Sequence, residues 1–189
     1  MTYDVAALQR AAWVDRIVYQ SRVSSTSDLA RQLAAEAPRG TSLLVLADEQ
    51  SAGRGRGSNR WWTGAGSLAF SLLLDSPDLG VPRRHAAMIS LAAAIALAET
   101  VAPVVPHERL GIHWPNDVFV ADRKLAGILV EALADGRHIL GVGVNVNNPV
   151  ALAPPDLQQA ITSLIDLTGC DHDRTQLLLE LLGSLHAAL

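Results

Sequence analysis

The chain has 189 residues, 49% of them hydrophobic and 18% charged, a composition that argues against disorder and favours one folded domain over residues 1–189. The net charge of −4 argues against a dedicated nucleic-acid binder, which would carry a basic surface. A single cysteine, Cys170, excludes an intrachain disulfide and a zinc site made of several cysteines. The longest apolar run, residues 86–98, is too short to span a bilayer, and the N-terminus has no apolar run of signal-peptide type. We therefore expect a cytoplasmic protein with no membrane or nucleic-acid partner.

The first half of the chain alternates strands and helices. In chain order, the sequence predicts a strand over 16–23, a helix over 29–37, a strand over 41–47, a loop, a strand over 67–74 and an alanine-rich helix from 82 to near 103. Pro38 and Gly40 end the first helix, and Pro82 opens the second.

The second half is richer in strands. The sequence predicts a strand over 109–114, a turn over 115–117, a strand meander over 118–146 with a hairpin turn near 134–137, a loop over 147–156, and helices over 157–169 and 175–189. This order favours an α+β fold, in which a mixed or antiparallel sheet carries helices on one face. The last helix is too apolar to be fully exposed, so one face should pack on the sheet or on a second subunit.

The stretch "GRGRGSNRWW", Gly53 to Trp62, forms the loop between two predicted strands. It is either a solvated surface loop or a binding loop, and two consecutive tryptophans favour binding. No helix start or Walker lysine follows, which argues against a Rossmann or P-loop phosphate site. Glycines let backbone N–H groups approach an anion closely, and the guanidinium groups of Arg54 and Arg56 add paired donors. Because Trp61 or Trp62 offers a ring for stacking, the loop predicts a nucleotide site.

Two further groups of residues agree with a binding site. "HWPND" places Asn116 and Asp117 in a turn, and a strand–turn–strand return brings Lys124 towards them; alternatively, the first two only shape the turn and the lysine is solvated. "GVGVNV" places Gly141 and Gly143 on one face of a strand, either to leave room for a ligand or to allow a bulge or close packing.

Together these motifs resemble the biotin–protein ligases, also called biotin–[carboxylase] ligases, from about Val23 to Leu167. The matching features are a Ser-Thr pair, a glutamine before "GRGR", a tryptophan after it, and the motifs "HWPND", "KLAGIL" and "GVGVN". The resemblance implies the catalytic fold shared with class II aminoacyl-tRNA synthetases. Three motifs in the same order and spacing make the resemblance specific.

The chain departs from the family pattern at three places. Ser58 and Asn59 replace a glycine and an arginine, and His113 replaces the lysine before Trp-Pro-Asn-Asp. The chain is also shorter than many relatives, so we expect neither an N-terminal DNA-binding domain nor the small C-terminal β-barrel. The substitutions at Asn59 and His113 predict less fixed positive charge around the phosphates.

The resemblance implies that ATP activates biotin as biotinyl-5′-AMP, and that a lysine of a biotin carboxyl carrier protein then takes the biotin. It implies that biotin contacts Ser25, Thr26, Gln50, Arg54, Arg56, Gly127, Gly141 and Gly143. It implies that ATP and the adenylate contact Arg54, Gly55, Arg56, Trp61, Asn116, Lys124 and Asn145. Lys124, Arg56 and Asp117 are the expected catalytic residues, with Asp117 also the candidate Mg²⁺ ligand. The glycine-rich loop is expected to become ordered only when ligands bind.

Two alternatives stay open at this point. A lipoate or octanoate ligase or transferase shares the fold, and a non-catalytic biotin-binding protein would share the pocket without the chemistry. A homodimer is compatible with the apolar C-terminal helix.

Overall fold

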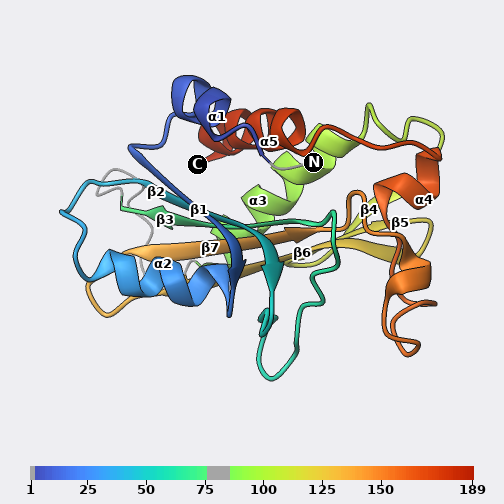
Figure 1. Ribbon diagram of the computed structural model, residues 1–189, viewed down its shortest axis with the longest axis horizontal. Coiled ribbons are helices and arrows are strands. Elements are labelled where there is room, and N and C mark those ends of the chain that lie inside the picture. The colour runs from blue at the N-terminus through green and yellow to red at the C-terminus, as the bar shows by residue number, and fades with distance from the viewer. Residues whose placement is uncertain (1–2, 76–85) are drawn as a thin grey trace.

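The computed structural model describes residues 3–75 and 86–189, whose strands form one seven-stranded mixed sheet (Figure 1). The strands are β1 (Arg16–Val23), β2 (Leu43–Gln50), β3 (Leu68–Leu74), β4 (Leu110–His113), β5 (Asp117–Val120), β6 (Arg123–Ala132) and β7 (His138–Val144). Their order in the sheet is β1-β2-β3-β7-β6-β5-β4. Only β1 and β2 pair in parallel; every other neighbouring pair is antiparallel, as the predicted meander requires.

The described helices lie on both faces of this sheet (Figure 1). They are α1 (Val5–Ala11), α2 (Thr26–Ala34), α3 (Ala86–Val101), the 3₁₀ turn Val150–Leu152, α4 (Leu164–Thr168) and α5 (Arg174–Ala188). The α+β fold class is confirmed, but the expectation of helices on one face holds only for α1, α3 and α5, because α2 covers the opposite face. The central strands are apolar on both sides, so each face needs a cover: Leu44 and Leu46 belong to the core under α3 and α5, whereas Leu43 and Val45 pack towards α2.

Three helices differ from the sequence prediction. The short helix α1 was not expected, and α2 begins three residues earlier than predicted. The expected helix over 157–169 is largely wrong, since only Leu164–Thr168 is helical. The segment before it pairs with β6 instead: the backbone N–H of Lys124 donates to the Ala160 carbonyl at 2.9 Å, and that of Thr162 donates to the Lys124 carbonyl at 2.9 Å. The predicted start of the alanine-rich helix at Pro82 lies outside the described residues.

The C-terminal helix α5 buries its leucines inside the chain. Leu178, Leu181, Leu182 and Leu185 are almost fully buried, and α5 packs mainly against α3. The expectation that one face of this helix is covered is therefore confirmed, and α3 rather than a second subunit provides the cover. Among the residues that the structure describes, no helix is long and apolar enough to cross a membrane.

Candidate active site

Two adjoining cavities lie where the first turn of α2 and the β2–β3 connection meet the middle of strands β6 and β7. The first has a volume of about 170 Å³ and the second about 840 Å³. The residues that line both are Gln50, Asn59, Arg60, Trp61 and Lys124. Nearly all the residues singled out from the sequence line the first cavity: Ser25, Thr26, Gln50, Arg54, Gly55, Arg56, Trp61, Asn116, Asp117, Lys124, Gly127, Gly141 and Gly143. Asn145 lines the second. The fold thus gathers residues that are far apart in the sequence.

One wall of the first cavity is a network of hydroxyl and amide groups around Thr26. The Thr26 backbone N–H donates to Gln50 Oε1 at 2.8 Å, and its hydroxyl donates to the same oxygen at 3.1 Å. The Thr26 hydroxyl also lies 2.8 Å from that of Ser71 on β3. Ser25 is only 1% exposed, and its Oγ has no hydrogen-bond partner among the residues that the structure describes. A buried polar group without a partner is costly, so this hydroxyl is well placed to bond a ligand.

Several residues of this wall were not expected from the sequence. Ser27 lies 2.9 Å from Ser71 through their hydroxyls, and Gln50 Nε2 donates to the Thr63 hydroxyl at 3.0 Å. Phe70 is the largest fully buried side chain and lines the same cavity. The available signal was Ser71 itself, a serine within an otherwise apolar strand.

The stretch Gly53–Trp62, here called the Gly-Arg loop, is a tight hairpin in this structure. The Gly55 N–H donates to the Asn59 carbonyl at 2.8 Å, and the Trp61 N–H donates to the Gly53 carbonyl at 3.0 Å. A Cβ on Gly53 would lie 2.6 Å from the Trp61 carbonyl oxygen, so only glycine fits there. The loop therefore has regular backbone hydrogen bonds, and its ordering by ligands stays a prediction.

Arg54 anchors this hairpin to the rest of the fold. Its guanidinium makes two hydrogen bonds to Glu131 on β6, at 2.8 and 2.5 Å, and lies 3.1 Å from Asp28 on α2. Arg31 also contacts Glu131, at 2.8 Å. Burial raises the pKa of Glu131, but the hydrogen bonds and charges of Arg54 and Arg31 outweigh that effect and leave its pKa below the ordinary value. The hydrogen bond from Arg54 to Glu131 likewise raises the pKa of this arginine.

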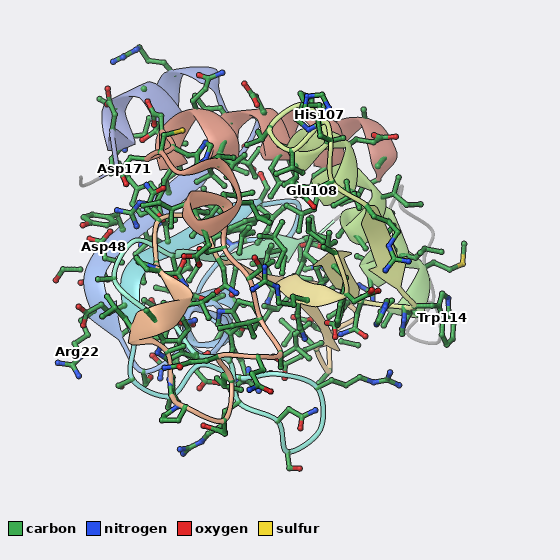
Figure 2. All side chains as sticks on the ribbon, turned by 90° about the vertical axis from the view of Figure 1, so that its right-hand side faces the viewer. Arg22, Asp48, His107, Glu108, Trp114 and Asp171 are labelled. Carbon is green, nitrogen blue, oxygen red and sulfur yellow. The ribbon has the colours of Figure 1, made fainter. Side chains whose placement is uncertain are left out.

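Asn116, Asp117 and Lys124 form a compact polar group on the β4–β5 turn and the adjoining strands. The amide nitrogen of Asn116 donates to Asp117 Oδ1 at 2.9 Å, and Lys124 Nζ lies 2.7 Å from Asp117 Oδ2. The β5–β6 hairpin brings these groups together, as the sequence predicted for the strand–turn–strand return. Trp114, just before this turn, is 75% exposed and projects from the edge of the molecule (Figure 2).

The glycines of β6 and β7 make room for the side chains of Trp61 and Ser27. Gly127 and Gly143 are direct partners across the two strands, and the Trp61 ring lies over them. A Cβ on Gly127 would lie 3.1 Å from this ring, and one on Gly143 would overlap it. Gly141 accommodates Ser27, whose hydroxyl would be 2.8 Å from an added Cβ. Lys124 Nζ is 5.7 Å from the centroid of the Trp61 ring, within the range of a cation–π contact.

Two of the residues singled out from the sequence have mainly structural contacts. The Asn145 amide nitrogen donates to the Thr162 carbonyl at 3.0 Å, and its oxygen accepts from the Asn148 side chain at 3.0 Å. His113 lines neither cavity; its ring stacks on that of Phe119, with the centroids 3.7 Å apart.

The residues around Asp117 do not fit a magnesium site held by the protein. Both carboxylate oxygens are engaged, one by Asn116 and the other by Lys124. Within residues 3–75 and 86–189, no three acidic, histidine or cysteine side chains gather into a group that could hold a metal ion. Any Mg²⁺ would therefore depend on oxygens supplied by a substrate phosphate.

Comparison with known proteins identifies the fold and its relatives. Residues 19–147 match the biotin/lipoate A/B protein ligase family. The bifunctional ligase/repressor BirA of Bacillus spizizenii is 36% identical over 163 residues, which cover 84% of this chain and 49% of that protein. The biotin–[acetyl-CoA-carboxylase] ligase of Mycobacterium tuberculosis is 36% identical over 172 residues, which cover 88% of this chain and 62% of that protein. The chain thus spans about half to three-fifths of the length of these curated relatives.

Solved structures agree with the sequence relatives. The biotin protein ligase of Aquifex aeolicus in complex with biotin and ATP superposes with a TM-score of 0.74 at 28% identity, covering 92% of this chain and 70% of that one. The Leishmania major enzyme in complex with biotinyl-5-AMP also gives a TM-score of 0.74, at 25% identity, over 90% of this chain and 73% of its own. With its mixed sheet, its paired cavities and a family match over more than half its length, this chain belongs to the biotin/lipoate A/B protein ligase family.

Proposed function

We propose that this chain joins biotin to a carrier protein in two steps, through biotinyl-5′-AMP made from biotin and ATP. The observation that carries this proposal is the pair of cavities that meet at Lys124 and Trp61. One cavity offers buried hydrogen-bonding groups to a small polar ring, and the other is in the size range of nucleotide pockets. A reaction that joins two substrates needs their reacting ends to meet, and Lys124 lies at that junction.

The polar wall suits the ureido ring of biotin. A ureido group has one carbonyl acceptor and two N–H donors. Ser25 Oγ has no partner, and Thr26 and Gln50 lie beside it with both donor and acceptor atoms. We assign the ring to these three residues and the acyl chain to the apolar side of the cavity beside Phe70.

In the first step, a biotin carboxylate oxygen attacks the α-phosphorus of ATP, and the bond to the β-phosphate oxygen breaks. Pyrophosphate leaves with that electron pair, and a mixed anhydride of biotin and AMP remains. Negative charge gathers on the phosphate oxygens, so fixed cations are the main requirement. We assign this task to Lys124 and Arg56, and we assign the adenine to the face of Trp61 that is turned away from the glycines.

In the second step, a lysine amine of the carrier attacks the biotinyl carbonyl carbon. The bond to the AMP oxygen breaks, an amide forms, and the amine loses its proton. We assign the orientation of the incoming amine to Asp117 and Asn116, whose carboxylate and amide face the first cavity. If Mg²⁺ takes part, the phosphates of ATP would supply most of its oxygen ligands, and it would add positive charge there.

Further proposals concern the location, partner, domain organisation and oligomeric state of the chain. The use of ATP supports a cytoplasmic location, and the partner is a biotin carboxyl carrier protein. Residues 1–189 would act as one catalytic domain, and a homodimer stays a prediction to be checked by sedimentation.

Two other activities compete with this proposal. The family includes lipoate ligases, but a lipoyl or octanoyl group has no ureido ring to occupy the polar wall around Ser25. A non-catalytic biotin-binding protein would need only the biotin cavity. The second cavity, which shares lining residues with the first, therefore favours the ligase.

A single labelling assay separates the three activities. The chain is incubated with ATP and a carrier domain, together with biotin, lipoate or octanoate. We expect biotin on the carrier lysine and pyrophosphate release that depends on biotin. Lipoyl or octanoyl transfer would replace the proposal with the first competitor, and biotin binding without pyrophosphate release would replace it with the second.

A further inference from the structure

We propose that Arg60 binds the phosphate groups of the nucleotide, an assignment that rests on the proposed function. Arg60 is exposed and belongs to the small set of residues that line both cavities. Arg56, by contrast, lines only the first. In the proposed reaction, ATP lies in the second cavity and the biotin carboxylate in the first. The phosphate chain between them must therefore pass Arg60, which lines both cavities.

The hairpin fixes the direction in which Arg60 projects. Its backbone pairs with that of Arg54 in an antiparallel bridge. Residues directly opposite each other in such a pair project to the same face. Arg54 and Arg60 both line the first cavity, so this paired position of the hairpin stands on the cavity side of the loop.

The distribution of charge separates Arg60 from the other cations of the site. Arg54 is paired with Glu131 and Asp28, and Lys124 is paired with Asp117. Within the described parts of the chain, neither Arg60 nor Arg56 has an ion pair or a side-chain hydrogen bond. These two guanidinium groups are therefore the ones available to an incoming polyanion without breaking an existing pair. A guanidinium matches phosphate oxygens with two parallel hydrogen bonds.

The residues around Arg60 show why a positive charge is needed at this position. The neighbouring Asn59 lines the same two cavities but is uncharged. Two acidic residues, Asp122 and Asp156, line the second cavity and would repel a phosphate chain. Asp122 is paired with Arg109, whereas Asp156 has no such partner among the described residues. Arg60, which lines both cavities, offsets this negative charge where the two cavities meet.

The test compares Arg60→Gln with Arg10→Gln, an exposed arginine of α1 that lines neither cavity. Calorimetry measures the affinities for ATP, adenosine and biotin separately. We expect Arg60→Gln to weaken ATP binding by about 10- to 100-fold, as for the loss of hydrogen bonds to a charged group. The affinities for adenosine and biotin should change by less than about 2-fold, and Arg10→Gln should bind all three like the wild type.

A second variant checks that the charge itself matters. Asn59→Arg in the Arg60→Gln background moves the guanidinium by one residue along the same two cavities, and we expect it to restore part of the ATP affinity. Unchanged ATP affinity in Arg60→Gln would overturn the assignment, as would an equal loss of adenosine affinity. The proposed function is judged separately, by biotin-dependent pyrophosphate release from the wild type. If the wild type binds ATP but releases no pyrophosphate, the proposed function is wrong. The role of Arg60 is then still tested by the ATP affinity of Arg60→Gln. Failure of the wild type to bind ATP would overturn both.

Discussion

Lys124 is the only lysine in the sequence, and it lines both cavities. An ammonium is a compact point charge, and this one lies 2.7 Å from Asp117 and over the edge of Trp61. A Cβ added to Gly127 would lie 3.2 Å from Lys124 Nζ, so the glycine leaves room for the ammonium. The planar fork of an arginine is not equivalent to such a compact charge. The residue is therefore held from three sides at the junction of the two cavities.

We predict that Lys124→Ala lowers biotinyl-AMP formation by at least about 100-fold, because a positioned cation at a developing oxyanion typically contributes 10²–10³ in rate. Biotin affinity should change little, since the ureido contacts are assigned to Ser25, Thr26 and Gln50. Lys124→Arg should recover only part of the rate. Pyrophosphate release reports the rate, and calorimetry reports the affinity.

The neighbouring Arg123 provides the matched control. Successive side chains of a strand project to opposite faces, and Arg123 lines neither cavity. Arg123→Ala should release pyrophosphate at a normal rate. Normal release by Lys124→Ala as well would mean that another cation of the site stabilises the phosphate charge.

For single residues, the sequence indicated which side chains line the cavities, but not which side chains they bond to. Short motifs were enough to single out Gln50, Arg56 and Lys124. No local pattern could reveal that Arg54 is paired with Glu131, because the two are 77 residues apart and meet only when β6 enters the sheet. Ser27 and Ser71 were missed for the same reason, since their hydroxyls matter only as a pair across α2 and β3.

At the scale of elements, the β6–β7 hairpin carries a flat surface made by two facing glycines. Gly127 and Gly143 expose the backbone of both strands to the Trp61 ring. From the sequence, these glycines were expected to leave space for a ligand. The Trp61 ring lies over these glycines, so it forms the wall that a nucleotide would contact.

We predict that Gly143→Ala displaces Trp61, because the added Cβ would overlap the indole. The overpacking should lower the free energy of unfolding by about 1–3 kcal/mol, and the displaced ring should weaken ATP binding. Gly111→Ala on β4 is the control, because no atom lies within 4 Å of its added Cβ. Urea unfolding and calorimetry check both effects. If the two variants behave alike, Trp61 does not rest on the glycines in solution.

The Gly-Arg loop gives a second prediction at this scale. Glu131→Gln should release Arg54 and let the hairpin open, so trypsin should cut after its arginines about 10-fold faster, as expected for a local loss of about 1–3 kcal/mol. Glu99→Gln, an exposed change on α3, should leave the cleavage rate unchanged. Equal cleavage of both variants would mean that the backbone hydrogen bonds hold the loop alone.

The same contact predicts how stability depends on pH. The pKa of Glu131 in the folded chain is lowered from its ordinary value of 4.5. Its contribution to the free energy of unfolding is therefore fully present above pH 4.5 and is lost as the pH falls through the lower folded value. The difference in urea stability between the wild type and Glu131→Gln should thus be constant near neutral pH and shrink below about pH 4.5.

The elements themselves were predictable where the signal was local. The strands of the meander follow from alternation, apolar runs and turn residues, and the structure confirms them within a few residues. The predicted helix over 157–169 was wrong because pairing of Ala160 and Thr162 with Lys124 competes with helix formation there. Helix α1 was missed because seven residues, capped by Asp4, depend on packing against β1 and α5 for their stability.

At the scale of the whole molecule, one arginine joins the two ends of the chain to the base of the Gly-Arg loop. Arg174, at the start of α5, donates to the Ser67 carbonyl at 2.8 Å and to the Tyr3 hydroxyl at 3.2 Å, and it pairs with Asp48 at 3.2 Å. Ser67 precedes β3 and Asp48 lies near the end of β2, so these contacts hold the two strands that carry the loop. Asp48 also accepts a hydrogen bond from Tyr19.

We predict that Arg174→Met lowers the free energy of unfolding by about 3–5 kcal/mol, because it leaves the Asp48 carboxylate and a buried carbonyl without their cation. Adding Asp48→Asn should recover part of that loss, since the uncompensated charge is removed, and the double variant should be less destabilised than the sum of the single ones. Arg10→Met on exposed α1 should be near neutral. Urea unfolding of the four variants measures these differences, and ATP affinity shows whether the loop moves with its base. If the losses of the two single variants simply add, the arginine and the carboxylate act independently, and the helical layer holds the loop through apolar packing alone.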